Sequence, residues 1–267
     1  MKDNTPVLYI PKELKDYRTQ IASTTEPFIK ITTEKRNSTL DGSKFGGEPY
    51  LPEGTEYPVN KKRNPLRLLA QINFLEVPFI EGMPKEGVLQ FYIDAEDDLM
   101  GMNLEDLCDQ TGFKILYHPS IERDLPRPIG RQKEWNDDEF FPVEDEMCLS
   151  FQQDIEPVSS EDFRNEELLG EMKEELLDYD EEELDLWELY YEAFSGEGHK
   201  IGGYPYFTQE DPRHNNQYEQ HDVLLLQVDT DENGIMWGDS GVGNFFIKKE
   251  DLHNLNFENV LYYWDCH

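Results

Sequence analysis

The string Gly238-Asp239-Ser240-Gly241 could carry out nucleophilic catalysis, because it echoes the turn that presents the serine of trypsin-like proteases. Attack by Ser240 would require a base that takes its proton, a group that orients this base, and donors for the oxyanion. The string precedes a strand-like run, and glycine, aspartate and serine are ordinary turn residues. We therefore expect a structural turn rather than a catalytic serine.

Oxygen-bearing side chains at alternate positions could bind calcium nearby. Asp229, Asp231 and Asn233 precede Gly234, as in the first part of an EF-hand loop. That pattern next needs a bidentate glutamate, but the chain has Ser240 at this position. The sequence therefore predicts an acidic hairpin turn, with a weak calcium site as the alternative.

Other metal chemistry would need ligands at suitable spacing. A divalent ion held by Asp229, Asp231 and Asp239 could activate water for hydrolysis. The histidines form no HxH or HExxH pair and the cysteines no CxxC pair; they are His118, His199, His214, His221, His253, His267, Cys108, Cys148 and Cys266. A zinc site that joins His214 and His221 to the C-terminal Cys266 and His267 is a further alternative. No metal and no cofactor is predicted.

Two glutamines, Gln71 and Gln227, each interrupt an apolar strand-like run at the same place. A buried amide without a hydrogen-bond partner costs about 1–3 kcal/mol, so we expect each amide to bond backbone between the two halves of the molecule. The alternative is a ligand-binding groove between these halves. Asp229, Trp237 and Asp239 would join the two amides in lining it.

Two glycine pairs, Gly46-Gly47 and Gly202-Gly203, are predicted to be structural turns, because glycine readily adopts positive φ. They could be mistaken for phosphate-binding loops. The chain has neither GxGxxG nor GxxxxGK[ST], and it is strongly acidic. We therefore exclude nucleotide binding at these turns.

The glycine pairs belong to a self-similarity at one fixed offset. GGEPY at 46–50 recurs as GGYPY at 202–206, and LLAQIN at 68–73 recurs as LLLQVD at 224–229, each 156 residues later. A fixed period indicates internal duplication. We expect one domain over 1–267 built of two repeats, approximately 27–120 and 145–267, the second of which carries an acidic helical insert at 160–196.

The elements that must position these residues are mainly strands. Strand-like runs occupy 27–33, 66–75, 87–94, 113–118, 223–229, 241–247 and 260–263, and the last of these is aligned with 115–118. An amphipathic helix is expected within 7–24. Hairpins dominate and no βαβ alternation is visible. The pattern predicts an α+β fold with mostly antiparallel sheets from two related halves.

The predicted insert is the most acidic part of the chain. Between Glu161 and Glu197 there are sixteen acidic residues and two basic ones. Apolar residues return there at helical spacing, in the stripes Leu168, Leu169, Met172, Leu176 and Leu184, Trp187, Tyr191, Phe194. We expect two short helices with acids outward, the first capped at its N-terminus by Ser160.

The net charge of −34 concerns partners rather than fold. Such a charge repels nucleic acid and anionic membranes and attracts basic proteins; improved solubility alone is the alternative. There is no apolar run of about 18 residues and no signal-like N-terminus. Three unpaired cysteines are typical of reducing conditions, so a cytoplasmic protein is expected.

Several stretches resemble the YwqG family of bacterial proteins, a family of unknown function: GGEPYLP (46–52), LRLLAQINF (66–74), GVLQFYI (87–93), GHKIGGYPYFTQEDPR (198–213), LLLQVD (224–229), MWGDSGVGNFFI (236–247) and NVLYYWDC (259–266). The resemblance implies a cytosolic, duplicated α+β protein and supplies no catalytic residue. Suspected proximity of family members to toxin systems would suit an immunity or antitoxin role.

Three functional hypotheses follow. The first is a non-enzymatic protein that binds a basic protein partner through its acidic surface. The second is a small-molecule or peptide-binding protein with the groove described above. The third is a metal-assisted hydrolase. The sequence leaves open the oligomeric state and whether the two halves form one sheet or two.

Overall fold

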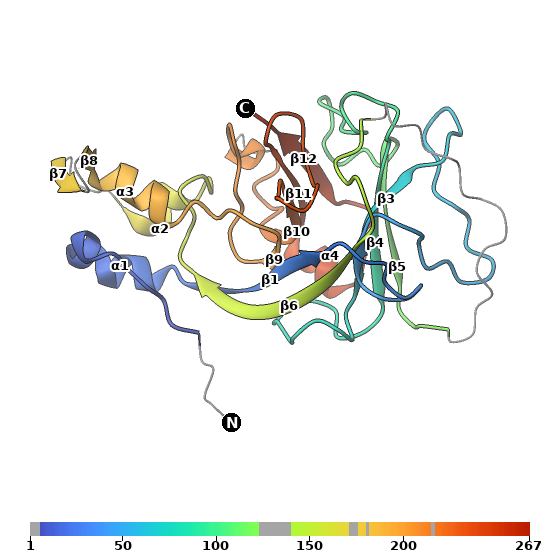
Figure 1. Cartoon of the computed structure of the whole chain (residues 1–267), viewed down its shortest axis with the longest axis horizontal. Helices are drawn as coiled ribbons and strands as arrows, with labels where there is room; N and C mark the ends of the chain where they lie inside the picture. The colour runs from blue at the N-terminus through green and yellow to red at the C-terminus, as the bar shows by residue number, and fades with distance from the viewer. Residues whose placement is uncertain (1–5, 123–139, 171–175, 180–181, 215–216) are drawn as a thin grey trace.

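The computed structural model describes residues 6–122, 140–170, 176–179, 182–214 and 217–267 (Figure 1). The helical elements are η1 (Lys12–Tyr17), α1 (Arg18–Ser23), α2 (Asn165–Leu169), α3 (Leu186–Ala193), η2 (Pro212–His214) and α4 (Lys249–His253). The strands are β1 (Glu26–Glu34), β2 (Lys44–Phe45), β3 (Arg67–Asn73), β4 (Val88–Ile93), β5 (Phe113–His118), β6 (Met147–Glu156), β7 (Leu176–Tyr179), β8 (Glu182–Asp185), β9 (Lys200–Gly202), β10 (Val223–Asp229), β11 (Val242–Ile247) and β12 (Leu261–Asp265).

Ten strands form one sheet in the order β12-β11-β10-β9-β1-β6-β2-β3-β4-β5. Every pairing between the described strands is antiparallel. The long strands β1 and β6 lie side by side at the centre, and four strands follow on each side. We call β2–β5 the first half and β9–β12 the second half. The expected mostly antiparallel architecture is confirmed: both halves belong to one ten-stranded sheet, β7 and β8 form a separate two-stranded sheet, and helices are few.

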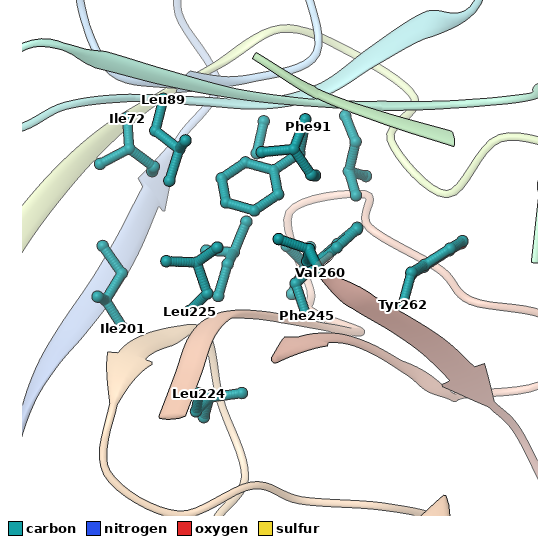
Figure 2. Packing of buried hydrophobic residues seen from close by; sticks show 14 of the residues in the cluster. Ile72, Leu89, Phe91, Ile201, Leu224, Leu225, Phe245, Val260 and Tyr262 are labelled. Atoms are coloured by element: carbon teal, nitrogen blue, oxygen red, sulfur yellow. The ribbon is translucent and has the colours of Figure 1, made fainter. Parts of the chain in front are cut away.

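The sheet curls into a nearly closed barrel, so that its two halves face each other across the main core. Figure 2 shows Phe91 of β4 above Phe245 of β11, and the ring centroids lie 4.9 Å apart. Both side chains are fully buried. Aromatic and aliphatic side chains therefore fill the space between the halves, where burial of apolar area stabilises the fold.

The two halves share one irregularity. Strand pairing shifts by one residue between Leu68 and Ala70 in β3, and again between Leu224 and Leu226 in β10. A bulge of this kind bends a strand and redirects a side chain. In Figure 2, Leu225 and Leu224 point to opposite sides of β10, and both are buried members of the main core cluster.

The register corrects one alignment made from the sequence. Phe91 lies opposite Ile115, and Phe245 lies opposite Tyr262. Tyr262, rather than Val260, is therefore the structural counterpart of Ile115. The similar residues at 115–118 and 260–263 suggested an alignment that is two residues off. A shift of two residues keeps every side chain on the same face of the sheet, so the alternating pattern does not reveal it.

A second body of structure projects from the barrel and contains η1, α1, α2, α3 and the β7–β8 hairpin (Figure 1). We call it the arm. Its helices share a separate apolar core formed by Ile10, Leu14, Tyr17, Ile21, Val158, Leu169, Leu186, Leu189, Tyr190 and Tyr204. The expected N-terminal amphipathic helix is confirmed, as a 3-10 turn that leads into α1.

The arm differs from the two helices expected in this region. Leu176 and Leu184 belong to the strands β7 and β8, and Met172 lies outside the described residues. Ser160 caps no helix; instead Asp185 and Glu188 form a capping box at the start of α3. The two acids satisfy orphan backbone N–H groups reciprocally, which favours the start of α3 at this position.

Candidate functional site

Gln71 lies on β3 with its side chain fully buried. Its Oε1 accepts hydrogen bonds from the backbone N of Tyr50 and from Nε2 of Gln90, each at 2.8 Å. Its Nε2 donates to the carbonyls of Leu40 at 2.9 Å and Gly42 at 2.8 Å. The amide therefore fastens two irregular segments of the first half onto the sheet.

Gln227 repeats this arrangement on β10. Its Oε1 accepts from the backbone N of Tyr206 at 2.8 Å, and its Nε2 donates to the carbonyls of Gly196 at 2.9 Å and Gly198 at 2.7 Å. The expected bonds to backbone are present, but each amide bonds within its own half. The structure does not bring Gln71 and Gln227 together.

The two glycine pairs adopt positive φ, at 65° and 75° for Gly46 and Gly47 and at 74° and 69° for Gly202 and Gly203. A Cβ at Gly47 would overlap the carboxylate of Glu146. Glycine is therefore required at these turns both by conformation and by space.

Each turn follows a buried lysine that sequence reasoning missed. Lys44 Nζ donates to the carbonyls of Thr39 at 2.8 Å and Glu48 at 3.1 Å. Lys200 Nζ donates to Glu156 at 2.7 Å and to the carbonyl of Tyr204 at 3.2 Å. Burial lowers the pKa of Lys44. The recurrence of lysine at the common offset was the available signal.

Asp229 and Asp231 are engaged within the protein. Asp229 accepts from the backbone N of Gly198 at 2.6 Å and of Thr230 at 2.8 Å. Asp231 Oδ1 accepts two backbone N–H groups of its own turn, and Oδ2 lies 3.2 Å from Nε2 of His199. The backbone N of Asp229 donates to Nδ1 of His199, so the proton of this imidazole is on Nε2 and points to Asp231.

Trp237 and Asp239 lie apart from these acids. Trp237 is fully buried in the main core, against Gly243 and Tyr262. Asp239 is exposed in the following turn, with Ser240 beside it at a φ of 55°. Of the five residues proposed to line a groove, the structure therefore places only Gln227 and Asp229 on one face of one strand.

A cysteine–histidine pair that the sequence did not indicate joins Cys108 and His221, with Sγ and Nε2 3.5 Å apart. Nε2 also lies 3.2 Å from the carbonyl of Asn259, which can only accept. Burial raises the pKa of Cys108 to about 12 and lowers the pKa of His221. Both shifts favour the neutral forms, so this pair does not provide a thiolate nucleophile at neutral pH.

A buried ion network connects the arm to the second half. Arg213 contacts Asp211 at 2.6 Å and Asp162 at 3.0 Å, and Asp162 also binds Arg164 at 2.7 Å. The guanidinium of Arg213 lies over the ring of Phe246. Separation of the arm from the second half would leave these buried charges without partners. The network therefore favours one arrangement of the arm on the second half.

Two features are absent from the residues that the structure describes, a metal-ligating cluster and a membrane-spanning helix. No group of three or more histidine, cysteine, aspartate or glutamate side chains there could hold a metal ion. No helix in that part of the chain has the length and apolar character needed to cross a membrane. The three cysteines carry free thiols.

The comparisons with known proteins give a family and no function. No curated protein matches the chain. Residues 43–266, which include all strands of both halves and exclude η1, α1 and β1, match the model of one protein family. On this evidence, the chain belongs to the family described as "Domain of unknown function (DUF1963)".

Proposed function

We propose that this protein is a non-enzymatic interaction protein that binds a basic protein partner through the acidic surface of its arm. The observation that carries the proposal is the combination of a net charge of −34 with exposed aromatic side chains on α3. A cytoplasmic location, a YwqG-like identity and an immunity-type role are parts of this proposal, favoured by the sequence stretches quoted above.

The exposed face of α3 supports a binding role. Trp187 and Tyr191 are each 39% exposed, one helical turn apart, and Glu188 and Glu192 are exposed beside them. Tryptophan and tyrosine are enriched at binding hot spots, and negative charges at the rim speed association with a positive partner. A basic, partly apolar surface is the complement of this face.

We also propose that the two halves are copies of one ancestral unit, and that 160–196 is an acidic insertion within the second. The matching positions of Gln71 and Gln227, of Lys44 and Lys200, and of the two bulges support this history. Duplication would explain why β1 and β6 occupy equivalent central positions in the strand order.

The other two hypotheses receive less support. A groove between the halves has little room, because Phe91, Phe245 and their neighbours pack there. A metal-assisted hydrolase would need the oxygens of Asp231, which already accept hydrogen bonds from its own turn and from His199 and Thr33.

The test is capture of partners from an extract of the native host by immobilised protein, followed by elution at rising salt. A basic protein that is retained at low salt and released at high salt is the expected result, because exposed charges are screened by salt. Trp187→Ala and Tyr191→Ala should reduce retention, whereas Phe79→Ala, which alters an exposed aromatic of the barrel, should not. Absence of any basic partner at low salt would contradict the proposal.

A further inference from the structure

The two ends of the ten-stranded sheet are joined by a connection rather than by strand pairing. β5 and β12 end the strand order, and among the described strands they do not pair with each other. Residues 99–110 of the first half, which lie between β4 and β5, cross this seam, and we call them the strap. The backbone N of Tyr262 on β12 donates to the carbonyl of Leu107 at 2.9 Å, and the backbone N of Leu107 donates to Tyr218 OH at 3.1 Å. The strap therefore occupies the position of a neighbouring strand along β12.

Groups on both sides of the seam hold the strap. Gln110 Oε1 accepts from the backbone N of Ile115 on β5 at 3.1 Å, and its Nε2 donates to the carbonyl of Phe257, which precedes β12, at 2.7 Å. Trp264 Nε1 on β12 donates to the carbonyl of Leu99 at 2.8 Å. Opening of the strap alone would leave the ten-stranded sheet paired, so it requires less free energy than unfolding of the whole barrel.

His221 of the second half lies against the strap and is only 2% exposed. Its Nε2 is 3.5 Å from Sγ of Cys108 in the strap and 3.2 Å from the carbonyl of Asn259. A carbonyl can only accept, so the neutral ring carries its proton on Nε2 and a lone pair on Nδ1. Nδ1 is buried and has no hydrogen-bond partner among the described residues. The strap therefore helps to enclose an imidazole with one ring nitrogen unpaired.

The titratable groups around His221 and Cys108 come from the strap, from the segment before β10, and from α4 with its N-cap. Besides these two residues they are Asp106, Tyr218, Lys248 and Asp251. Burial lowers the pKa of His221, and the charge of Lys248 lowers it further. The carbonyls of Asn259 and Tyr218 and the charge of Asp251 act in the opposite direction but do not outweigh burial.

Acid should favour the open strap. Opening exposes His221 to water, so its pKa returns towards the ordinary value of 6.5. The closed form therefore binds fewer protons than the open form. Closure is favoured above about pH 6.5 and becomes less favourable as the pH falls below this value.

We propose that the strap is an acid-sensitive closure of the barrel and that protonation of His221 releases it. Release would uncover the thiol of Cys108 and the outer edge of β12, where Tyr262 loses its backbone partner. An uncovered edge presents unpaired N–H and C=O groups to solvent. The central pair β1 and β6 would stay intact, because it lies in the middle of the strand order. This device is part of the barrel and is independent of partner binding by the arm.

The test is hydrogen exchange of the whole protein, followed by mass spectrometry at about pH 7.5 and about pH 5.5, with each rate corrected for the intrinsic rate at that pH. Opening of the strap should become about three- to tenfold more favourable at the lower pH; about tenfold is the most that one group with a pKa of 6.5 in the open form allows. Peptides that contain Leu107 and Tyr262 should lose protection, whereas peptides from β1 and β6 should keep it. Unchanged protection of the strap, or an equal loss in β1 and β6, would overturn the proposal.

Two histidine variants assign the trigger. His221→Gln keeps a donor for the carbonyl of Asn259 but cannot gain a charge, so protection of the strap should no longer depend on pH. His118→Gln is the matched control, because burial also lowers the pKa of His118, whose Nε2 lies 3.1 Å from Oε1 of Gln90 within the sheet. This control should keep the pH-dependent opening of the strap. The same pH dependence in His221→Gln as in the wild type would overturn the proposal.

A lysine variant gives an answer even if His221→Gln does not fold. Lys248→Gln leaves the imidazole in place but removes a positive charge that opposes its protonation in the closed seam. The change in opening between the two pH values should therefore be about twofold smaller than in the wild type. Lys249→Gln, at the exposed neighbour, should behave as the wild type. Equal pH dependence in both lysine variants would contradict the role of His221.

Discussion

Arg213 donates through Nη2 to Oδ2 of Asp162 across 3.0 Å, and both side chains are fully buried. Asp162 leads into the arm, and Arg213 belongs to η2 in the second half. This ion pair therefore fixes the arm relative to the barrel.

Asp162→Ala should destabilise the protein by about 3–5 kcal/mol, because it leaves Arg213 buried with one partner fewer. Urea unfolding would measure the change. Glu166→Ala, which alters an exposed acid of the arm, should stay within about 0.5 kcal/mol of the wild type. Similar stabilities for the two variants would show that the buried pair contributes little.

Gln71→Ala and Gln227→Ala should each destabilise the fold by about 2–4 kcal/mol, because each removes the amide that bonds one backbone N–H and two carbonyls. Thermal or urea unfolding would measure this effect. Gln152→Ala, on the exposed part of β6, is the control and should be nearly neutral. Normal stability together with loss of ligand binding would instead favour a groove function for these amides.

Gly47→Ala and Gly203→Ala should each cost at least about 2 kcal/mol, because a positive φ strains alanine and its Cβ would overlap a glutamate carboxylate. Gly54→Ala is a matched control, since Gly54 has a φ of 85° but no atom within 4 Å of an added Cβ. It should show the conformational cost alone, about 1 kcal/mol. Equal effects at all three positions would mean that the glutamates move aside freely.

Asp231 should stabilise the fold in a pH-dependent manner. Burial acts to raise its pKa, but hydrogen bonds from His199 and Thr33 outweigh it and lower the pKa to about 2, from 3.8. The folded state therefore binds fewer protons than the unfolded state between these values, so this stabilisation is present above about pH 4 and is lost as the pH falls towards about 2.

Asp231→Asn should consequently be less stable than the wild type at neutral pH, and the difference should shrink at about pH 3 in urea unfolding. Glu232→Gln, at the exposed neighbour, should match the wild type throughout. A difference for Asp231→Asn that is independent of pH would mean that the carboxylate charge contributes nothing.

Much of the barrel could be predicted locally. β5 and β10 have the predicted bounds. The run of β5 is ended by Pro119, and the apolar run of β10 begins after the polar His221 and Asp222. β6 was not predicted: its exposed polar residues, such as Gln152, obscure the apolar pattern, and its order comes from pairing with β1.

The arm shows a similar division. The apolar stripe around Trp187 correctly indicated a helix, α3. The same helical spacing also included Leu176 and Leu184, but these residues lie on β7 and β8, which pair with each other as a hairpin. Short apolar runs are compatible with either periodicity, so pairing partners decide between them.

The sequence by itself determined the offset of 156 residues, the strand-rich pattern and the strong negative charge, since these depend only on residue types and their order. Tertiary structure alone decided that Lys44 is surrounded by carbonyls, that Gln71 and Gln227 serve separate halves, and that Cys108 meets His221. The physical reason is that a buried polar atom depends on partners that the folded backbone brings close, and the backbone partners of the two glutamines lie 21 to 31 residues away along the chain.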